Sequence, residues 1–138
     1  MKLKGKVAII TGGGRGIGRC IARKLAKREV TLAITSRTES QLVEVYNELN
    51  KFTEIFYKSL DIRKEKEVKK FINEVVRKYK RIDILINNAG YVKPLSLLET
   101  TLRDWKAQID TNLTGTFLMT REVVKHMKNY GGKIVNIA

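Results

Sequence analysis

The stretch TGGGRGIG at residues 11–18 follows directly on the apolar run VAII at residues 7–10. After it, the apolar residues Ile21, Ala22 and Leu25 recur at helical spacing. A strand therefore leads through a glycine-rich turn into a helix. Doubly wound α/β domains bind the pyrophosphate of a dinucleotide in this way, because glycines let the backbone approach the phosphates and the helix N-terminus offers free N–H groups. The alternative is a turn that uses glycine for packing alone, but the flanking strand and helix favour the dinucleotide site.

Strand-like and helix-like segments alternate along the rest of the chain. The sequence predicts strands at 6–10, 30–35, 54–58, 82–86 and 133–137, and helices at 16–28, 39–50 and 64–80. Residues 102–127 carry an apolar stripe typical of one long helix or two abutting helices. We therefore expect a Rossmann-like α/β fold with a doubly wound parallel sheet of strand order 3-2-1-4-5. Residues 1–138 form one domain in this interpretation, and its sheet stops after the fifth strand.

Composition limits the class of protein. A chain of 138 residues with 43% hydrophobic residues is long and apolar enough for one folded domain. No apolar run approaches the length of a membrane span, and residues 1–4 lead into a strand without a signal-peptide core. The single cysteine, Cys20, excludes an internal disulfide framework, and we expect it to pack as a small apolar residue. These features favour a cytoplasmic protein with no membrane partner. No cluster of His, Cys and carboxylate residues has the spacing of metal ligands.

The charge balance is strongly basic, with 28 Lys and Arg residues against 14 Asp and Glu and a formal net charge of +14. Such a balance is found in proteins with anionic partners, and also on the solvated surfaces of thermophile proteins. We favour the solvated surface, because the charges are spread along the helices and interleaved with Glu. The chain has no helix-turn-helix, aromatic platform or basic arm, so we expect no nucleic-acid partner.

The residues after the second predicted strand bear on the kind of dinucleotide. In many NAD sites an acid stands there, about twenty residues beyond the glycines, and binds the ribose 2′-hydroxyl. This chain has Ser36 and Arg37 instead. A carboxylate would repel a 2′-phosphate, whereas Arg37 can hold it, and Arg15 can help from the glycine-rich turn. We therefore predict NADP(H) rather than NAD(H); the alternative is that Arg37 is a solvated loop residue.

Several motifs together resemble the short-chain dehydrogenase/reductase family, over essentially all 138 residues. Residues 11–18 fit its TGxxxGxG motif, and residues 87–90 are its NNAG motif, preceded by Asp83 in the usual place. Asp61-Ile62 looks like the adenine-contacting pair of the family, and Asn112 matches the helix asparagine of its catalytic tetrad. The resemblance implies reversible interconversion of carbonyl and alcohol groups. The candidate cofactor-binding residues are Thr11, Gly12, Gly14, Arg15, Gly16, Ile17, Gly18, Ser36, Arg37, Asp61, Ile62, Asn88, Ala89 and Gly90.

The same resemblance places the remaining catalytic residues at or beyond the end of these 138 residues. The serine would fall at or just past Ala138, and none of the five tyrosines in the chain has a lysine four residues later. We expect residues 1–138 to bind cofactor without turnover, and a small carbonyl or alcohol substrate to require a longer chain. The alternative is a non-catalytic dinucleotide-binding module that acts through a partner. Trp105 and Phe117 fit a core or subunit-contact stripe, and we expect a homo-oligomer.

Overall fold

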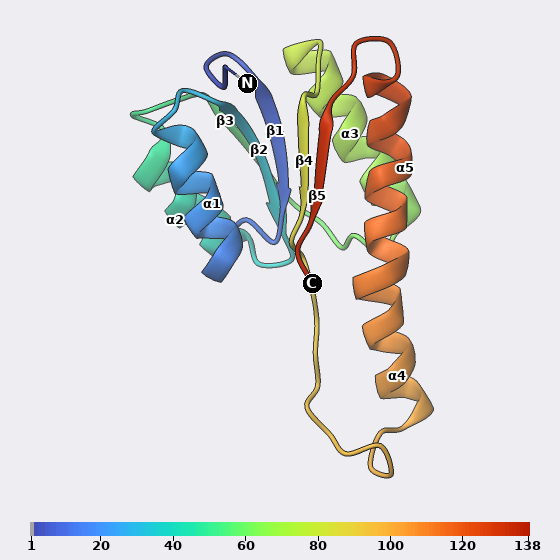
Figure 1. The fold of residues 1–138 in the computed structure, drawn as a ribbon. Coiled ribbons are helices and arrows are strands. Elements are labelled where there is room, and N and C mark those ends of the chain that lie inside the picture. The colour runs from blue at the N-terminus through green and yellow to red at the C-terminus, as the bar shows by residue number, and fades with distance from the viewer. Residues whose placement is uncertain (1) are drawn as a thin grey trace.

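A five-stranded parallel sheet lies at the centre of the chain, with helices against both of its faces (Figure 1). The computed structural model describes residues 2–138. The strands are β1 Val7–Thr11, β2 Thr31–Ser36, β3 Ile55–Ser59, β4 Ile84–Asn87 and β5 Lys133–Asn136, in the order β3-β2-β1-β4-β5. The helices are α1 Gly16–Ala26, α2 Glu39–Leu49, α3 Glu65–Tyr79, α4 Leu102–Ile109 and α5 Thr116–Met127, with a π-helical segment at Asp110–Gly115 between the last two. The predicted doubly wound sheet and its strand order are confirmed.

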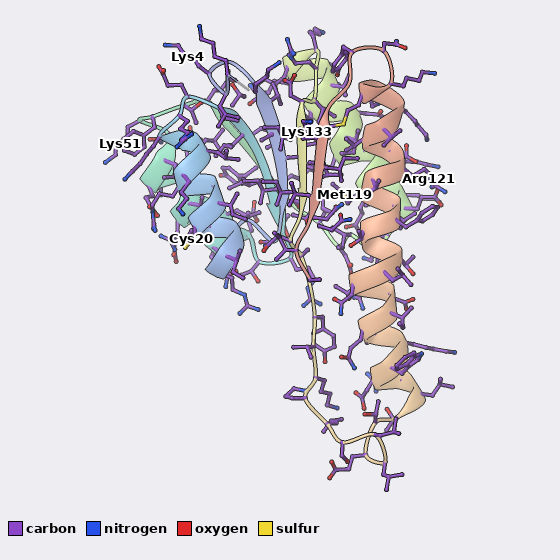
Figure 2. The ribbon with its side chains drawn as sticks, viewed as in Figure 1. Lys4, Cys20, Lys51, Met119, Arg121 and Lys133 are labelled. Atoms are coloured by element: carbon purple, nitrogen blue, oxygen red, sulfur yellow. The ribbon has the colours of Figure 1, made fainter. Side chains whose placement is uncertain are left out.

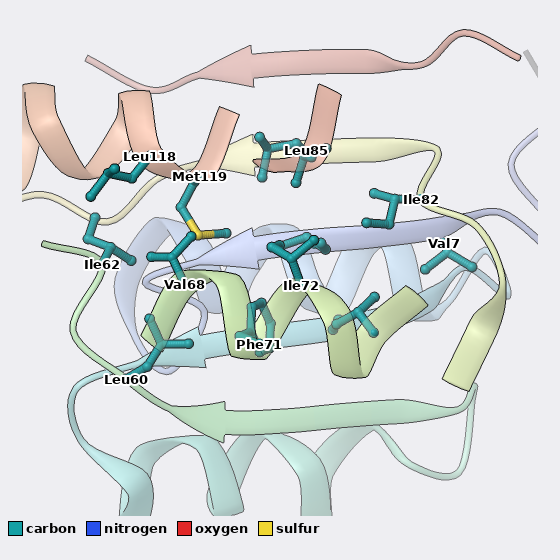
Figure 3. Close-up of a cluster of buried hydrophobic side chains, with 14 of the residues drawn as sticks. Val7, Leu60, Ile62, Val68, Phe71, Ile72, Ile82, Leu85, Leu118 and Met119 are labelled. Atoms are coloured by element: carbon teal, nitrogen blue, oxygen red, sulfur yellow. The ribbon is translucent and has the colours of Figure 1, made fainter. Parts of the chain in front are cut away.

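Alternation of side chains along the strands builds two hydrophobic cores. Ile9 of β1 belongs to the core under α3 and α5. Phe71 and Met119 belong to the same core (Figure 3). Its neighbour Ile10 belongs to the opposite core, with Leu42 of α2. Strands buried on both faces show continuous apolar runs rather than alternation. This explains why residues 7–10 carry no polar residue and why the helices fall on two sides.

The fourth strand begins later than predicted, at Ile84 rather than at Ile82. Side-chain hydrogen bonds hold Ile82 and Asp83, the two residues before the strand. The Asp83 carboxylate accepts hydrogen bonds from the Val7 N–H at 3.0 Å and from Arg81 Nε at 2.8 Å. The Ile82 N–H donates to the Tyr130 hydroxyl at 3.0 Å. Burial raises the pKa of Asp83, but the bonds from Arg81 and Val7 outweigh it and hold the pKa below its ordinary value.

One prediction about packing is wrong, and a second loses one of its two alternatives. Cys20 is exposed on α1 (Figure 2), because the buried face of this helix is made by Gly18, Ala22 and Ala26. Trp105 is 56% exposed and Phe117 is 54% exposed, which excludes the core alternative for this stripe and leaves the subunit-contact alternative as a prediction. Helix α4 runs past the end of the sheet (Figure 1), which leaves its apolar side without a sheet to cover it. Within residues 2–138, no helix combines the length and apolarity that crossing a bilayer requires.

Candidate functional site

The glycine-rich turn brings the start of α1 against the end of β1. Gly12 and Gly16 have positive φ angles of 64° and 53°, a backbone conformation that favours glycine. Gly18 is needed for space, because a Cβ there would lie 2.2 Å from the carbonyl oxygen of Gly12. Among the described residues, no side chain forms a capping hydrogen bond at Arg15, the N-cap of α1. The first N–H groups of α1 therefore remain available to an anion.

The ends of β1 and β4 are fastened together beside this turn. The Thr11 hydroxyl accepts hydrogen bonds from the backbone N–H groups of Asn88 at 3.0 Å and Ala89 at 2.9 Å. In return, the Asn88 side-chain amide donates to the carbonyl oxygens of Thr11 at 3.1 Å and Gly12 at 3.2 Å. A Cβ at Gly12 would lie 2.9 Å from that amide nitrogen. The first and fourth strand ends thus form one rigid edge at the point where the strand order reverses.

A cleft of about 360 Å³ opens at this edge, outside the carboxyl ends of β1, β2, β3 and β4. This volume lies in the range of small-ligand sites, roughly 300–1,000 Å³. Most of the predicted cofactor-binding residues line it: Gly12, Arg15, Gly16, Ile17, Ser36, Arg37, Asp61, Ile62, Asn88, Ala89 and Gly90. The structure therefore brings together residues from four separate strand ends.

The other three predicted residues support the cleft from behind. Thr11 is buried and acts through the hydrogen bonds described above. Gly18 gives α1 its close approach, and a Cβ at Gly14 would lie 2.9 Å from Gln41 Cβ and 3.2 Å from Ser36 Oγ. Residues 14 and 18 are therefore glycines because of packing within the site rather than contact with a ligand.

Sequence reasoning missed five further lining residues: Thr35, Thr38, Gln41, Leu60 and Thr111. Thr35 lies in β2, and Thr38 and Leu60 closely follow β2 and β3, so proximity to the strand ends is a usable signal for these three, whereas Gln41 lies in the first turn of α2. Thr111 lies in the π-helical segment, fifty residues beyond Asp61. No local sequence pattern predicts that it lines the cleft. Gly115 in the same segment lets this helix approach the cleft, because a Cβ there would lie 2.6 Å from Ile62 Cδ1.

Two arginines give the cleft positive charge. Arg15 and Arg37 both line it and both are exposed. Among residues 2–138, no salt bridge takes up either guanidinium. The acid in the lining, Asp61, is paired with Arg63, whose hydrogen bonds hold the pKa of that carboxyl below its ordinary value. Two unpaired guanidinium groups therefore face the cleft while its carboxylate is neutralised.

Asn112 lies outside the lining of this cleft, in the π-helical segment. Its side-chain oxygen accepts a hydrogen bond from the Tyr91 N–H at 2.8 Å, and its side-chain nitrogen donates to the Tyr91 carbonyl at 2.8 Å. The side chain thus fixes the segment that follows β4. π-helical turns inside α-helices are frequent at functional sites. Among residues 2–138, no group of three or more His, Cys, Asp or Glu side chains forms a candidate metal site.

Known proteins share this fold and this sequence pattern. A sequence model described as short chain dehydrogenase matches residues 6–138. The chain belongs to the short-chain dehydrogenase/reductase family. It is 38% identical over 141 residues to a 3-oxoacyl-(acyl-carrier-protein) reductase, FabG, of Aquifex aeolicus, covering 100% of this chain and 57% of that protein. The chain thus spans about half the length of the curated relatives it matches.

Two solved structures place the fold beside bound dinucleotides. An NAD⁺-bound xylitol dehydrogenase superposes with a TM-score of 0.94 at 29% identity, over 99% of this chain and 54% of that one. An alcohol dehydrogenase of the archaeon Thermococcus sibiricus, in complex with 5-hydroxy-NADP, superposes with a TM-score of 0.91 at 32% identity, over 95% of this chain and 57% of that one. Members of the family therefore bind a nicotinamide dinucleotide, and both the NAD and the NADP forms occur among them.

Proposed function

We propose that residues 1–138 are the cofactor-binding part of an NADP(H)-dependent oxidoreductase that interconverts carbonyl and alcohol groups. The observation that carries the preference for NADP(H) is the pair Arg15 and Arg37, which line the cleft with no carboxylate partner among the described residues. A phosphate binds such guanidinium groups through charge-assisted hydrogen bonds. A ribose 2′-phosphate would therefore be held where Ser36 and Arg37 end β2.

Each part of the cleft suits one part of the dinucleotide. The uncapped N-terminus of α1 and the turn at Gly12–Gly16 would hold the pyrophosphate. The adenosine half would lie toward Arg37 and the Asp61-Ile62 pair, and the nicotinamide half would lie toward Asn88–Gly90. When bound, the cofactor supplies a hydride. The protein must supply the orientation of the substrate and the transfer of a proton.

Residues 1–138 alone are proposed to bind cofactor without turnover. Asn112 is the one member of the catalytic tetrad assigned here, and its amide is engaged by Tyr91. A small carbonyl or alcohol substrate would then meet the remaining catalytic residues in a longer chain. The relatives are named as reductases and dehydrogenases, which favours an enzyme over a non-catalytic module that acts through a partner.

We further propose that the protein forms a homo-oligomer through α4 and α5. Exposed apolar side chains recur along these helices and the π-helical segment that joins them: Leu102, Trp105, Leu113, Phe117 and Val124. Large apolar side chains exposed along one helical stretch favour a contact with another protein. A cytoplasmic location stays a prediction from the use of a single cysteine, Cys20.

Calorimetric binding of NADPH and NADH at one fixed salt concentration tests the cofactor assignment. NADPH should bind about ten- to a hundred-fold more tightly, which corresponds to one charge-assisted phosphate contact. Arg37→Ala should remove most of this difference. Arg77→Ala is the matched control, because Arg77 is an exposed arginine in the last turn of α3, outside the cleft. Equal affinities of the unmodified protein for both cofactors would refute the assignment.

A further inference from the structure

A second cavity, of about 660 Å³, adjoins the cleft. It shares Arg37 and Thr111 with the cleft, but no residue of the glycine-rich turn lines it. The loops after β3 and β4 and the start of α4 supply the rest of its wall. The proposed arrangement of the dinucleotide, with its pyrophosphate on the glycine-rich turn, therefore does not account for most of this cavity.

Cations outnumber acids in the wall of the second cavity. One carboxylate lines it, that of Asp104, together with four cationic side chains: Arg37, Arg63, Lys93 and Arg103. Lys93 Nζ is paired with Asp104 Oδ1 at 2.8 Å. Among residues 2–138, no salt bridge takes up the guanidinium of Arg37 or of Arg103. Two guanidinium groups are therefore available to an anion in this cavity.

The positive charge is concentrated at the start of α4. The hydrogen bond to Asp104 raises the pKa of the Lys93 ammonium, and the nearby charge of Arg103 acts against this rise. Arg103 stands in the first turn of α4, and Thr101, the N-cap of this helix, also lines the cavity. The positive end of the helix dipole adds to the same field. A bound anion would offset the repulsion between these positive charges.

Arg63 keeps hydrogen-bond donors for such an anion although it is paired with Asp61. Its backbone N–H, Nε and Nη2 donate to the Asp61 carboxylate. A guanidinium has five N–H donors, of which two are on Nη1 and two on Nη2. Both donors on Nη1 and one on Nη2 thus remain beyond the contacts with Asp61. Arg63 can therefore bind Asp61 and an anion in the second cavity at the same time.

We propose that the second cavity binds the phosphate group of a small phosphate monoester. Such a group carries a charge of about −1.5 to −2 at pH 7 and has three acceptor oxygens. Its charge matches the two unpaired guanidinium groups of Arg37 and Arg103, and its oxygens can accept further hydrogen bonds from Arg63. Tyr91 and Ala107 line the same cavity and offer apolar surface to the remainder of the molecule. The inference goes beyond the proposed function and does not depend on it, because Arg103 and Lys93 lie outside the cleft.

Calorimetric titration of the full-length protein with inorganic phosphate, at an ionic strength held constant with sodium chloride, tests the inference. The unmodified protein should bind phosphate with a dissociation constant of about 1 mM or lower. Arg103→Gln should weaken this binding at least about tenfold, the effect of one hydrogen bond between charged groups. Arg103→Glu should abolish it, because a carboxylate repels the anion. Arg77→Gln is the control, since Arg77 is an exposed arginine on α3 outside both sites, and it should leave the binding unchanged.

A variant of Arg15 separates the second cavity from the cleft, because phosphate can also enter the cleft and Arg15 lines the cleft alone. Arg15→Gln should leave the affinity that depends on Arg103 within about twofold of its original value. Full helical content of Arg103→Gln by circular dichroism shows that its loss of binding is not a loss of fold.

Three results would overturn the inference. They are unchanged phosphate binding by Arg103→Gln, an equal weakening of one and the same site by Arg15→Gln and Arg103→Gln, and no binding by the unmodified protein at about 10 mM phosphate. If NADPH fails to bind while phosphate binds through Arg103, the proposed function fails and this inference stands.

Discussion

Replacing Gly18 and Gly16 by alanine separates the glycine that packs the site from the glycine that faces the ligand. At Gly18, the new Cβ would lie 2.2 Å from the carbonyl oxygen of Gly12 and 2.6 Å from Asn88 Nδ2. Carbon and oxygen need about 3.3 Å, so the start of α1 must move by about 1 Å. The displaced groups include the hydrogen bonds that join β1 to β4. Overpacking of this kind costs about 1–3 kcal/mol, and we expect about 3 kcal/mol.

At Gly16 the expected cost is smaller and has a different origin. No heavy atom beyond its chain neighbours lies within 4 Å of the new Cβ, but the residue has a φ of +53°. A left-handed alanine costs about 1–2 kcal/mol, and the reduced entropy of the unfolded chain returns about 0.4–1 kcal/mol. Gly16→Ala should therefore lose about 1 kcal/mol of stability and remain folded. Because Gly16 lines the cleft, its methyl group should still obstruct a pyrophosphate.

Urea unfolding and NADPH calorimetry on the two variants measure these effects. Gly18→Ala should lower the free energy of unfolding by about 2 kcal/mol more than Gly16→Ala, with an unchanged dependence on urea. Gly16→Ala should bind NADPH at least tenfold more weakly at full helical content, an effect of about 1.4 kcal/mol. Two variants of equal stability would refute the packing argument. Normal NADPH binding by Gly16→Ala would refute the placement of the pyrophosphate.

Two other perturbations test the stability and the assembly of the chain. Hydrogen bonds from Arg23, and to a smaller extent from Arg19, lower the pKa of the Glu48 carboxyl from 4.5 to about 2. A lowered pKa means that the ionised pair stabilises the fold above about pH 4.5 and that this contribution fades as the pH falls toward 2. Glu48→Gln should therefore lower the free energy of unfolding in urea by about 1 kcal/mol at pH 7 and by almost nothing near pH 2. An equal loss at both pH values would contradict this. Trp105→Lys should lower the molar mass measured by light scattering toward that of the monomer. Lys66→Ala, on the exposed face of α3, is the control and should leave the molar mass unchanged. An unchanged molar mass for both variants would argue against assembly through α4.

The parts of the molecule that the sequence predicts are those governed by short-range patterns. The strand order follows from alternating apolar segments, and the cleft follows from glycines and polar residues that sit directly at strand ends. The hydrogen bonds from the Arg63 guanidinium to the Asp61 carboxylate were not predicted, because no sequence pattern reports the direction of an arginine side chain in a loop. The exposure of Trp105 and Cys20 depends on where a helix lies relative to the sheet, and periodicity alone does not report this.

The π-helical segment at Asp110–Gly115 sets the register between the two helices it joins. Its hydrogen bonds span one residue more than those of an α-helix, so it holds a residue that regular α-helix would not accommodate. The wider turn takes up this residue locally, so α4 and α5 keep nearly the same relative orientation that a regular α-helix one residue shorter would give them. Asn112 lies within this turn, and its side chain makes both hydrogen bonds with the Tyr91 backbone. A deletion of one residue here would therefore change the local turn that carries the Asn112–Tyr91 contact and leave the faces of α4 and α5 nearly where they are.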